Sequence, residues 1–195
     1  MTMSTHKTLF GPQGGAILSY NSFAKCIKKA IFPGLTSNHH LHHVAGKAIA
    51  FAEMLKFGRE YATQVVKNAK ALAQALAERG FRVLGESRGF TESHQIAVDI
   101  TNFGDGGTLE KRLEQANIIV NRQLIPRDIQ AGRHYMHPGG LRLGTAEVTR
   151  LGMCESEMVE IAEFMKRVIV NREDPKLSLI HISEPTRLGM ISYAV

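Results

Sequence analysis

The sequence predicts an α/β protein, because short apolar segments with the period of a strand alternate with longer segments that have the period of a helix. Hydrophobic residues make up 44% of the 195 residues and charged residues 22%, a balance typical of a chain that buries an apolar core. This composition excludes a disordered chain, and no apolar run reaches the roughly 18 residues that a membrane-spanning helix needs.

The first part of the chain predicts short elements. Residues 4–15 are rich in glycine, threonine and proline, so we expect a turn region there, followed by a short buried strand at 16–20. The basic stretch from Lys25 to Lys29 predicts a short helix, and the sequence Phe32-Pro33-Gly34 predicts a turn.

A long helical pattern runs from about His40 to Arg79, with polar residues on the face opposite the apolar one. Gly80 stands where a helix stop is expected, and Gly58 suggests a break between two helices. The apolar face is formed by Tyr61, Val65, Ala69, Leu72 and Leu76.

The remaining chain alternates between strands and helices. Strands are expected at 81–84, 95–100, 118–120 and 141–143, and helices at 109–116 and 155–170. We therefore divide the chain into two unequal parts, residues 1–57 as the end of one domain and residues 58–174 as a smaller α/β domain with its own strands.

The net charge and the number of cysteines limit which binding partners and which cellular compartment are expected for this protein. The net charge is +6, and a basic patch at Lys25, Lys28 and Lys29 would permit nucleic-acid binding, but no aromatic series accompanies it. We therefore consider nucleic acid an unfavoured partner and interpret the patch as a solvated helix face. Two lone cysteines and an N-terminus without an apolar signal core predict a cytoplasmic protein.

The last residues differ from the rest of the chain. The segment 177–187 resembles the conceptual translation of a sequencing-library transposase adapter, and 191–195 resembles that of the adapter that follows it. We interpret residues 175–195 as a non-native tail and leave them out of the fold prediction; the alternative is a genuine C-terminal strand.

Lys7 is the first candidate for chemistry, because it stands between hydroxyl residues and a glycine-rich run and is not committed to a helix face. Amine catalysis needs such an accessible lysine, although a solvated loop lysine is the more common interpretation of the residue taken alone. The run Gly11–Gly15 could cradle phosphate, but it matches no nucleotide-binding spacing, so a tight turn is the default.

The histidines His39, His40, His42 and His43 could suggest a metal site, but the cluster contains no carboxylate or cysteine. We expect no metal here and favour a helix start at which the histidine rings contact one another or form hydrogen bonds. Arg142 lies between two leucines in a predicted strand, where its charge requires a partner. That partner could be a bound carboxylate or a protein Asp or Glu, and both remain open.

Together these motifs closely resemble the serine hydroxymethyltransferase family, pyridoxal-phosphate enzymes of the aspartate-aminotransferase fold type. The resemblance rests on four segments in order, and it extends from Met1 to about Asp174. Residues 32–42 and 89–94 are similar to the archaeal-type branch. The four segments are Thr5-His6-Lys7-Thr8, Gly11-Pro12-Gln13-Gly14-Gly15, Phe32-Pro33-Gly34 and Gly140-Leu141-Arg142-Leu143-Gly144-Thr145.

The resemblance implies roles for individual residues. Lys7 matches the lysine that holds pyridoxal phosphate as a Schiff base, and His6 matches the histidine beside it, so both are assigned to catalysis and cofactor binding. Ser4 is included in the cofactor site. Arg142 matches the arginine that binds the amino-acid carboxylate. His42 matches a family histidine for which we infer no catalytic role.

Three departures from the family pattern qualify this assignment. Ser37 and Asn38 occupy positions where the family often has two glycines near the cofactor phosphate, and Gln123 stands where an asparagine contacts the pterin. The family's N-terminal half precedes the segment that Met1 begins. We therefore expect this polypeptide alone to be inactive.

The implied function is the interconversion of serine and glycine, with one-carbon transfer to tetrahydrofolate or tetrahydromethanopterin, in a homodimeric parent enzyme. The alternative is a pyridoxal-phosphate aldolase or transaldolase that acts on β-hydroxy amino acids such as threonine. Lys7 and Arg142 would serve either reaction and cannot separate the two.

Overall fold

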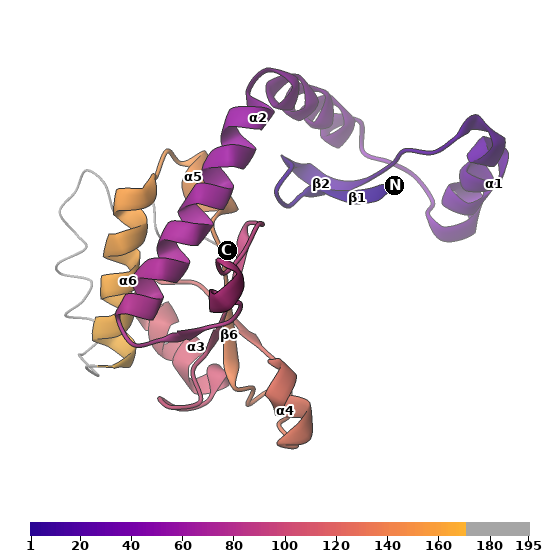
Figure 1. Cartoon of the computed structure of the whole chain (residues 1–195). Coiled ribbons are helices and arrows are strands. Elements are labelled where there is room, and N and C mark those ends of the chain that lie inside the picture. The colour runs from indigo at the N-terminus through magenta and orange to yellow at the C-terminus, as the bar shows by residue number, and fades with distance from the viewer. Residues whose placement is uncertain (171–195) are drawn as a thin grey trace. The chain divides into compact units, whose positions relative to one another are not determined.

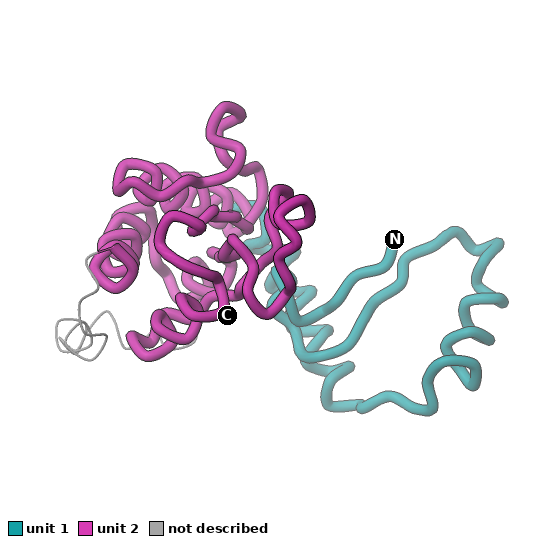
Figure 2. Tube along the Cα trace, turned by 90° about the horizontal axis from the view of Figure 1, so that it is seen from below, with its two compact units in different colours: residues 1–60 teal, residues 61–195 magenta. Residues whose placement is uncertain are grey.

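The computed structural model describes residues 1–170 and has the mixed α/β architecture that the sequence predicts (Figure 1). The proposed adapter-derived tail at 175–195 lies outside the described residues. The chain divides into two compact units, one from Met1 to Glu60 and one that begins at Tyr61 (Figure 2). Each unit is described by itself below.

The first unit begins with an antiparallel hairpin of β1 (Thr2–His6) and β2 (Phe10–Ile17). This differs from the turn region expected at 4–15 and from the buried strand expected at 16–20. Pairing with β1 extends β2 back through the glycine-rich run, and Ile17 and Leu18 are exposed rather than buried. Glycine and proline content therefore misled the prediction, because backbone pairing tolerates these residues in an exposed two-stranded sheet.

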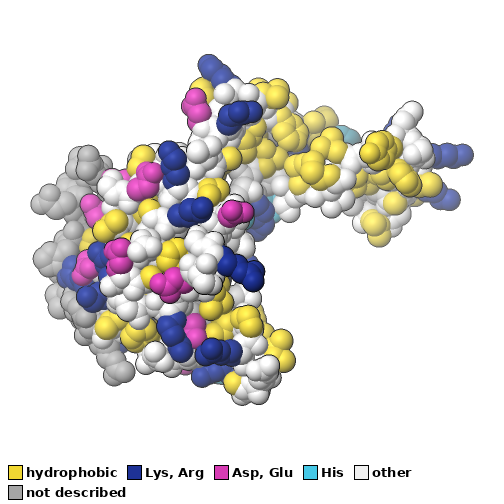
Figure 3. Space-filling model, viewed as in Figure 1, with side chains coloured by type: hydrophobic (Ala, Val, Ile, Leu, Met, Phe, Trp, Pro, Cys, Tyr) yellow, Lys and Arg dark blue, Asp and Glu magenta, His cyan; other side chains and the backbone are white. Residues whose placement is uncertain are grey.

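The basic helix is confirmed as α1 (Ala24–Lys29). It is followed by an irregular helical segment, Ala30–Leu35, in which Phe32 and Pro33 have non-helical dihedral angles, as the expected turn requires. Of the 18 large hydrophobic side chains that are exposed in the described chain, 14 lie in the Met1–Glu60 unit. Figure 3 shows hydrophobic side chains gathered on the face of this unit that is seen in that view.

Helix α2 (Leu41–Glu78) is one continuous helix of 38 residues, so the break expected at Gly58 is wrong. A single glycine costs a helix only about 1 kcal/mol, which the flanking turns offset. The predicted stop is confirmed, because Gly80 has a φ of +87°, a conformation that glycine adopts without strain.

The second unit contains a four-stranded antiparallel sheet in the order β3-β4-β6-β5. The strands are β3 (Arg82–Val83), β4 (Gln95–Asp99), β5 (Asn121–Gln123) and β6 (Gly140–Gly144). The strand expected at 118–120 is displaced to β5, because Ile118 and Val120 are buried by the core while pairing with β6 begins only at Asn121.

Four helices of this unit follow the strands: α3 (Gly106–Gln115), α4 (Pro126–Gln130), α5 (Ala146–Arg150) and α6 (Glu155–Ile169). The sequence predicted α3 and α6 and missed the two five-residue helices. The C-terminal half of α2 joins α3 and α6 in covering one face of the sheet. The core between them includes Leu76, Val98, Leu113, Leu141, Met158 and Met165.

Candidate functional site

The β1–β2 hairpin carries the predicted cofactor residues Ser4, His6 and Lys7. The register shifts between Ser4 and His6, so that Thr5 turns inward, is fully buried and donates from Oγ1 to the carbonyl oxygen of Pro12 at 2.8 Å. The backbone N–H of Gly14 donates to Nδ1 of His6 at 3.3 Å. These contacts fix the backbone on both sides of the turn that presents Lys7.

Lys7 is exposed at the end of β1, and its amine has no hydrogen bond or ion pair within residues 1–170. The glycine-rich run that follows lies in β2 rather than in a tight turn. Two of its glycines have a structural reason: a Cβ at Gly11 would lie 2.7 Å from the carbonyl oxygen of Thr5 and 3.3 Å from the Cβ of Ala50 in α2, and Gly14 has a φ of +143°.

Ser37 and Asn38 lie in the exposed segment that precedes α2, in the same unit as the hairpin. Among the described residues, no hydrogen bond joins them to Lys7 or His6. The structure therefore places these residues in one unit without bringing them into contact.

The histidines at the start of α2 contact one another, as expected from the sequence. The ring centroid of His43 lies 4.3 Å from that of His42, and both rings lie 5.6 Å from that of His40. Desolvation, followed by the charges of His42 and His40, lowers the pKa of His43. Residues 1–170 contain no group of three or more His, Cys, Asp or Glu side chains arranged to hold a metal ion.

In the second unit the structure brings Gln123 and Arg142 into one pocket of about 550 Å³. Strand register explains this arrangement. Arg142 is paired with Asn121 on one side and Ala97 on the other, and Gln123 is paired with Gly140, so these residues share the sheet face opposite the helices.

Arg142 is exposed on this face, whereas Leu141 and Leu143 beside it point into the core. Its guanidinium donates to Oδ1 of Asn121 at 3.2 Å, and within the described chain it forms no ion pair with an Asp or Glu. The structural ion pair that the sequence left open as an alternative is therefore not formed within residues 1–170.

His94, just before β4, was not predicted as a functional residue. Partial burial, and then the positive charge of Arg142, lower the pKa of its ring. Its carbonyl oxygen accepts from the backbone N–H of Thr145 at 3.0 Å, which ties the start of β4 to the end of β6. The quoted motif 89–94 contains this residue, but the motif alone gave no reason to place it near Arg142.

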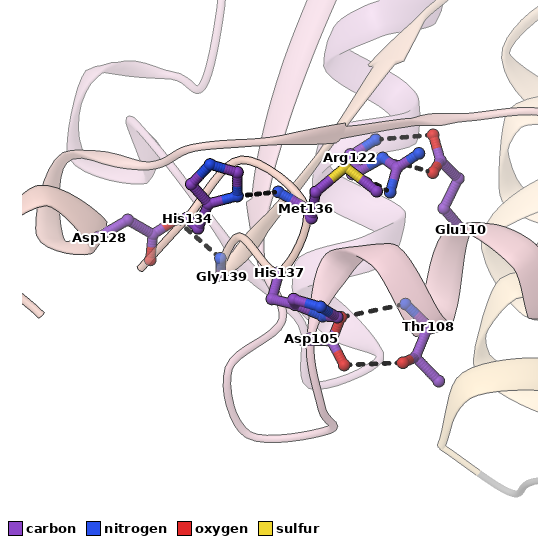
Figure 4. Close-up of polar contacts among 9 residues, drawn as sticks. All are labelled: Asp105, Thr108, Glu110, Arg122, Asp128, His134, Met136, His137 and Gly139. Carbon is purple, nitrogen blue, oxygen red and sulfur yellow. Dashed lines mark hydrogen bonds and ion pairs between the residues drawn. The ribbon is translucent and has the colours of Figure 1, made fainter. Parts of the chain in front are cut away.

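Asp128 was also missed, and it organises the loop between β5 and β6 (Figure 4). Its side chain is 1% exposed, and Oδ2 accepts from the backbone N–H groups of Ile125 at 3.0 Å and Gly139 at 2.7 Å. Nε of Arg133 lies 3.5 Å from Oδ1. Ile125 lies two residues after Gln123, and Gly139 lies three residues before Arg142. The Asp128 carboxylate therefore holds the two ends of the loop that connects Gln123 to Arg142 close to each other.

The sequence carries a signal for Asp128, since Pro126 at the first position of α4 with an acidic residue two positions later is typical of a helix start. The predicted site residues thus fall into two sets. Ser4, His6, Lys7, Ser37 and Asn38 belong to the Met1–Glu60 unit, and Gln123 and Arg142 belong to the unit that begins at Tyr61.

Comparison with known proteins assigns the chain to a family. A family model described as serine hydroxymethyltransferase matches residues 1–165. The chain belongs to the serine hydroxymethyltransferase family. The resemblance stated from the sequence motifs is therefore confirmed, including its archaeal character, since the similar curated proteins come from archaea.

Similar members of the family include serine hydroxymethyltransferases of archaea. That of Cenarchaeum symbiosum is 66% identical over 176 residues, which is 90% of this chain and 40% of that protein. That of Korarchaeum cryptofilum is 59% identical over 197 residues, all of this chain and 45% of that protein. The chain thus spans less than half the length of these curated relatives.

A solved structure supports the fold. The L-threonine transaldolase from Pseudomonas fluorescens, in its internal aldimine state, is 32% identical and matches with a TM-score of 0.81. The match covers 97% of this chain and 42% of the transaldolase. Family membership and this likeness explain why the motifs around Lys7 and Arg142 occur together in one chain.

Proposed function

We propose that this chain is the C-terminal part of a pyridoxal-phosphate-dependent serine hydroxymethyltransferase that interconverts serine and glycine. Residues 1–57 would be the end of the large cofactor-binding domain, and residues 58–174 would be the small domain. The observation that carries the proposal is the pocket in which Arg142, without a protein carboxylate, lies beside Gln123 in a member of this family.

The exposed apolar surface of the Met1–Glu60 unit supports its assignment to a larger domain. A monomeric surface seldom leaves so many large hydrophobic side chains exposed together, and the rest of a large domain would cover them. We accordingly propose that the polypeptide alone is inactive and binds the cofactor weakly. A visible absorption band from cofactor bound to the purified chain would contradict this.

The residues present fit pyridoxal phosphate. A lysine that holds this cofactor covalently must offer an accessible ε-amine, and the amine of Lys7 is exposed and has no partner in the described chain. His6 lies beside it, and the hydroxyl of Ser4 and the polar groups of Ser37 and Asn38 could donate to the phosphate or the ring. When bound, the cofactor accepts the electron pair released at the substrate's Cα.

The second unit would supply substrate recognition. Arg142 would bind the amino-acid carboxylate through its planar fork and so orient the bonds at Cα, while Asn121 holds the guanidinium in place. Gln123 would contact the pterin of tetrahydrofolate or tetrahydromethanopterin. Its Nε2 now donates to the carbonyl oxygen of Leu124 at 3.2 Å, a bond that it could exchange for one to a ligand.

The likeness to a transaldolase keeps a second candidate function, a pyridoxal-phosphate aldolase or transaldolase on β-hydroxy amino acids such as threonine. This alternative uses Lys7 and Arg142 in the same way and needs no pterin. The identities of 66% and 59% to serine hydroxymethyltransferases, against 32% to the transaldolase, favour the first function.

The test is steady-state kinetics of the full-length enzyme with serine and with threonine, each with tetrahydrofolate, with tetrahydromethanopterin and without a pterin. We expect serine cleavage to depend on a pterin and to disappear in Lys7→Ala, while the matched surface variant Lys25→Ala keeps it. Threonine cleavage that exceeds serine cleavage and ignores the pterin would establish the aldolase instead.

Two further variants address the pocket. Arg142→Lys keeps the charge but loses the bidentate fork, so we expect the KM for serine to rise about 10- to 100-fold. Gln123→Asn shortens the amide, and we expect it to change the preference between the two pterins. Unchanged pterin use in that variant would remove Gln123 from the pterin site.

We further propose that the parent enzyme is a cytoplasmic homodimer that acts on small molecules rather than on nucleic acid. Among residues 1–170, no helix is both long and apolar enough to cross a membrane. Size-exclusion chromatography with light scattering on the full-length enzyme tests the dimer, and salt-dependent retention of an oligonucleotide would contradict the last point.

A further inference from the structure

A second pocket, of about 500 Å³, lies in the unit that begins at Tyr61 and is not part of the proposed active site. It is bounded by α3, β5 and the segment that leads to β6. Register pairs its β5 residue, Arg122, with Leu141, which points into the core. Arg122 therefore lies on the helix-covered face of the sheet, opposite the face that carries Arg142.

The charged side chains that line this pocket are all basic. They are Lys111, Arg112 and Arg122, accompanied by the ring of His137, and no Asp or Glu is among the lining residues. Lys111 forms no ion pair within the described chain. An anion that enters the pocket would therefore meet basic side chains, while Glu110 and Asp105, which offset part of their charge, lie outside the lining.

Carboxylates outside the lining hold two of these groups in place (Figure 4). Glu110 accepts from Nε of Arg122 at 2.9 Å and from the backbone N–H of the same residue at 3.1 Å. Asp105 lies 3.1 Å from Nδ1 of His137. Because these contacts exist without a ligand, Arg122 and His137 would lose little conformational freedom on binding.

The terminal nitrogens of Arg122 remain suited to a ligand. Its Nη1 has the sulfur of Met136 at 3.9 Å, which is a weak acceptor compared with an oxygen. Gly107 lets the backbone of Met136 approach α3 closely, since a Cβ at Gly107 would overlap the carbonyl oxygen of Met136. A phosphate oxygen would be a stronger acceptor for this nitrogen.

We propose that this pocket binds a phosphate-class polyanion, of which inorganic pyrophosphate is the simplest probe. Arg122 supplies the planar fork that matches two phosphate oxygens, and Lys111 supplies a point charge from the neighbouring turn of α3. Because two separate basic side chains face the pocket, a ligand with two charged centres could pair with both at once.

The test is isothermal titration calorimetry of pyrophosphate into this chain, without magnesium and with ionic strength held constant by sodium chloride. We expect saturable binding that weakens at least about tenfold in Lys111→Ala and in Arg122→Lys. The matched control Lys70→Ala, an exposed lysine on α2, should bind as the wild type does. Circular dichroism confirms that each variant is folded.

Absence of saturable heat in the wild type, or equal affinity in Lys111→Ala and Lys70→Ala, would overturn the proposal. Binding of sulfate as tight as that of pyrophosphate would also overturn it, because a single anionic centre would then suffice. The experiment measures no enzymatic activity, so its outcome is independent of the proposed hydroxymethyltransferase function.

Discussion

Replacement of Asp128 by alanine tests the role assigned to this buried carboxylate in the loop between β5 and β6. The substitution removes both oxygens and leaves the backbone N–H groups of Ile125 and Gly139 without their acceptor. It also removes the partner of Arg133. The Cβ remains, so the backbone of α4 is not perturbed directly.

The expected loss follows from these contacts. A hydrogen bond to a charged group contributes about 1.5–3 kcal/mol, and Asp128 accepts two of them at 1% exposure. Arg133 contributes little, because its side chain is 33% exposed and 3.5 Å from the carboxylate. We therefore expect Asp128→Ala to lower the free energy of unfolding of this unit by about 3–5 kcal/mol.

The assay is urea unfolding of the chain, followed by far-ultraviolet circular dichroism since the sequence has no tryptophan. Both N–H groups donate to Oδ2, so Asp128→Asn keeps an oxygen that can accept from both and loses only the charge; its loss should be about half as large. Glu160→Ala, an exposed acidic residue on α6, is the matched control and should stay within about 0.5 kcal/mol of the wild type.

A loss below about 1 kcal/mol in Asp128→Ala would refute this reasoning. It would mean that water replaces the carboxylate at the two N–H groups, and that the loop holds its conformation without the side chain. Equal losses in the alanine and asparagine variants would show instead that the negative charge, rather than hydrogen-bond acceptance, is what the loop requires.

Three further predictions concern this unit. Arg142→Ala should raise the pKa of His94, because the positive charge of Arg142 is, after burial, the second cause that lowers this pKa. NMR titration of the imidazole measures the change. Partial burial alone would raise the pKa of Asp105, but hydrogen bonds from Thr108 and His137 outweigh it and lower the pKa to about 2. The stabilisation is therefore present above the ordinary value of 3.8, and the deficit of Asp105→Asn in urea unfolding should vanish as pH falls from 3.8 toward 2. Leu76→Ala removes a fully buried side chain, and thermal unfolding should show a loss of about 2–5 kcal/mol; a smaller loss would mean that the core collapses into the space.

Most elements of the second unit were predicted correctly, because the spacing of apolar residues along the sequence follows which side chains are buried. Strand β4 alternates as expected, with Ile96 and Val98 in the core, and α3 and α6 occur where apolar residues recur at helical spacing. Helices α4 and α5 were missed because five residues are too short to display a period. Their starts depend on single residues such as Pro126, which marks a helix start only in the folded context.

The first unit was predicted poorly for a physical reason. Its β1–β2 hairpin buries little, so its strands lack the apolar alternation from which strands are inferred. The glycines that indicated a turn meet other requirements: Gly11 lies close to the backbone of Thr5 and to Ala50 of α2, and Gly14 has a φ of +143°, and no local pattern reveals either. Composition cannot distinguish a glycine needed for a turn from one needed for close packing.

In the candidate site, too, some residues could be predicted from sequence motifs and others depend on contacts that only the folded chain makes. Motifs identified Lys7 and Arg142, and the sequence left open whether the charge of Arg142 meets a protein acid or a ligand. Strand register adds what the sequence could not show, since it places Asn121 rather than a carboxylate opposite Arg142. Asp128 and His94 act through contacts with distant backbone, which a linear pattern does not encode.

The alternation of buried and exposed side chains along β6 also favours a single register of this strand against β4. A slip of one residue against β4 would turn Arg142 into the core and expose Leu141 and Leu143, so the misaligned sheet would bury an unpaired charge. Insertions and deletions should therefore be tolerated in the exposed part of the loop around Gly132 but not within β6. The side chain proposed to recognise the substrate thus also ensures that the strand which carries it pairs in a single alignment.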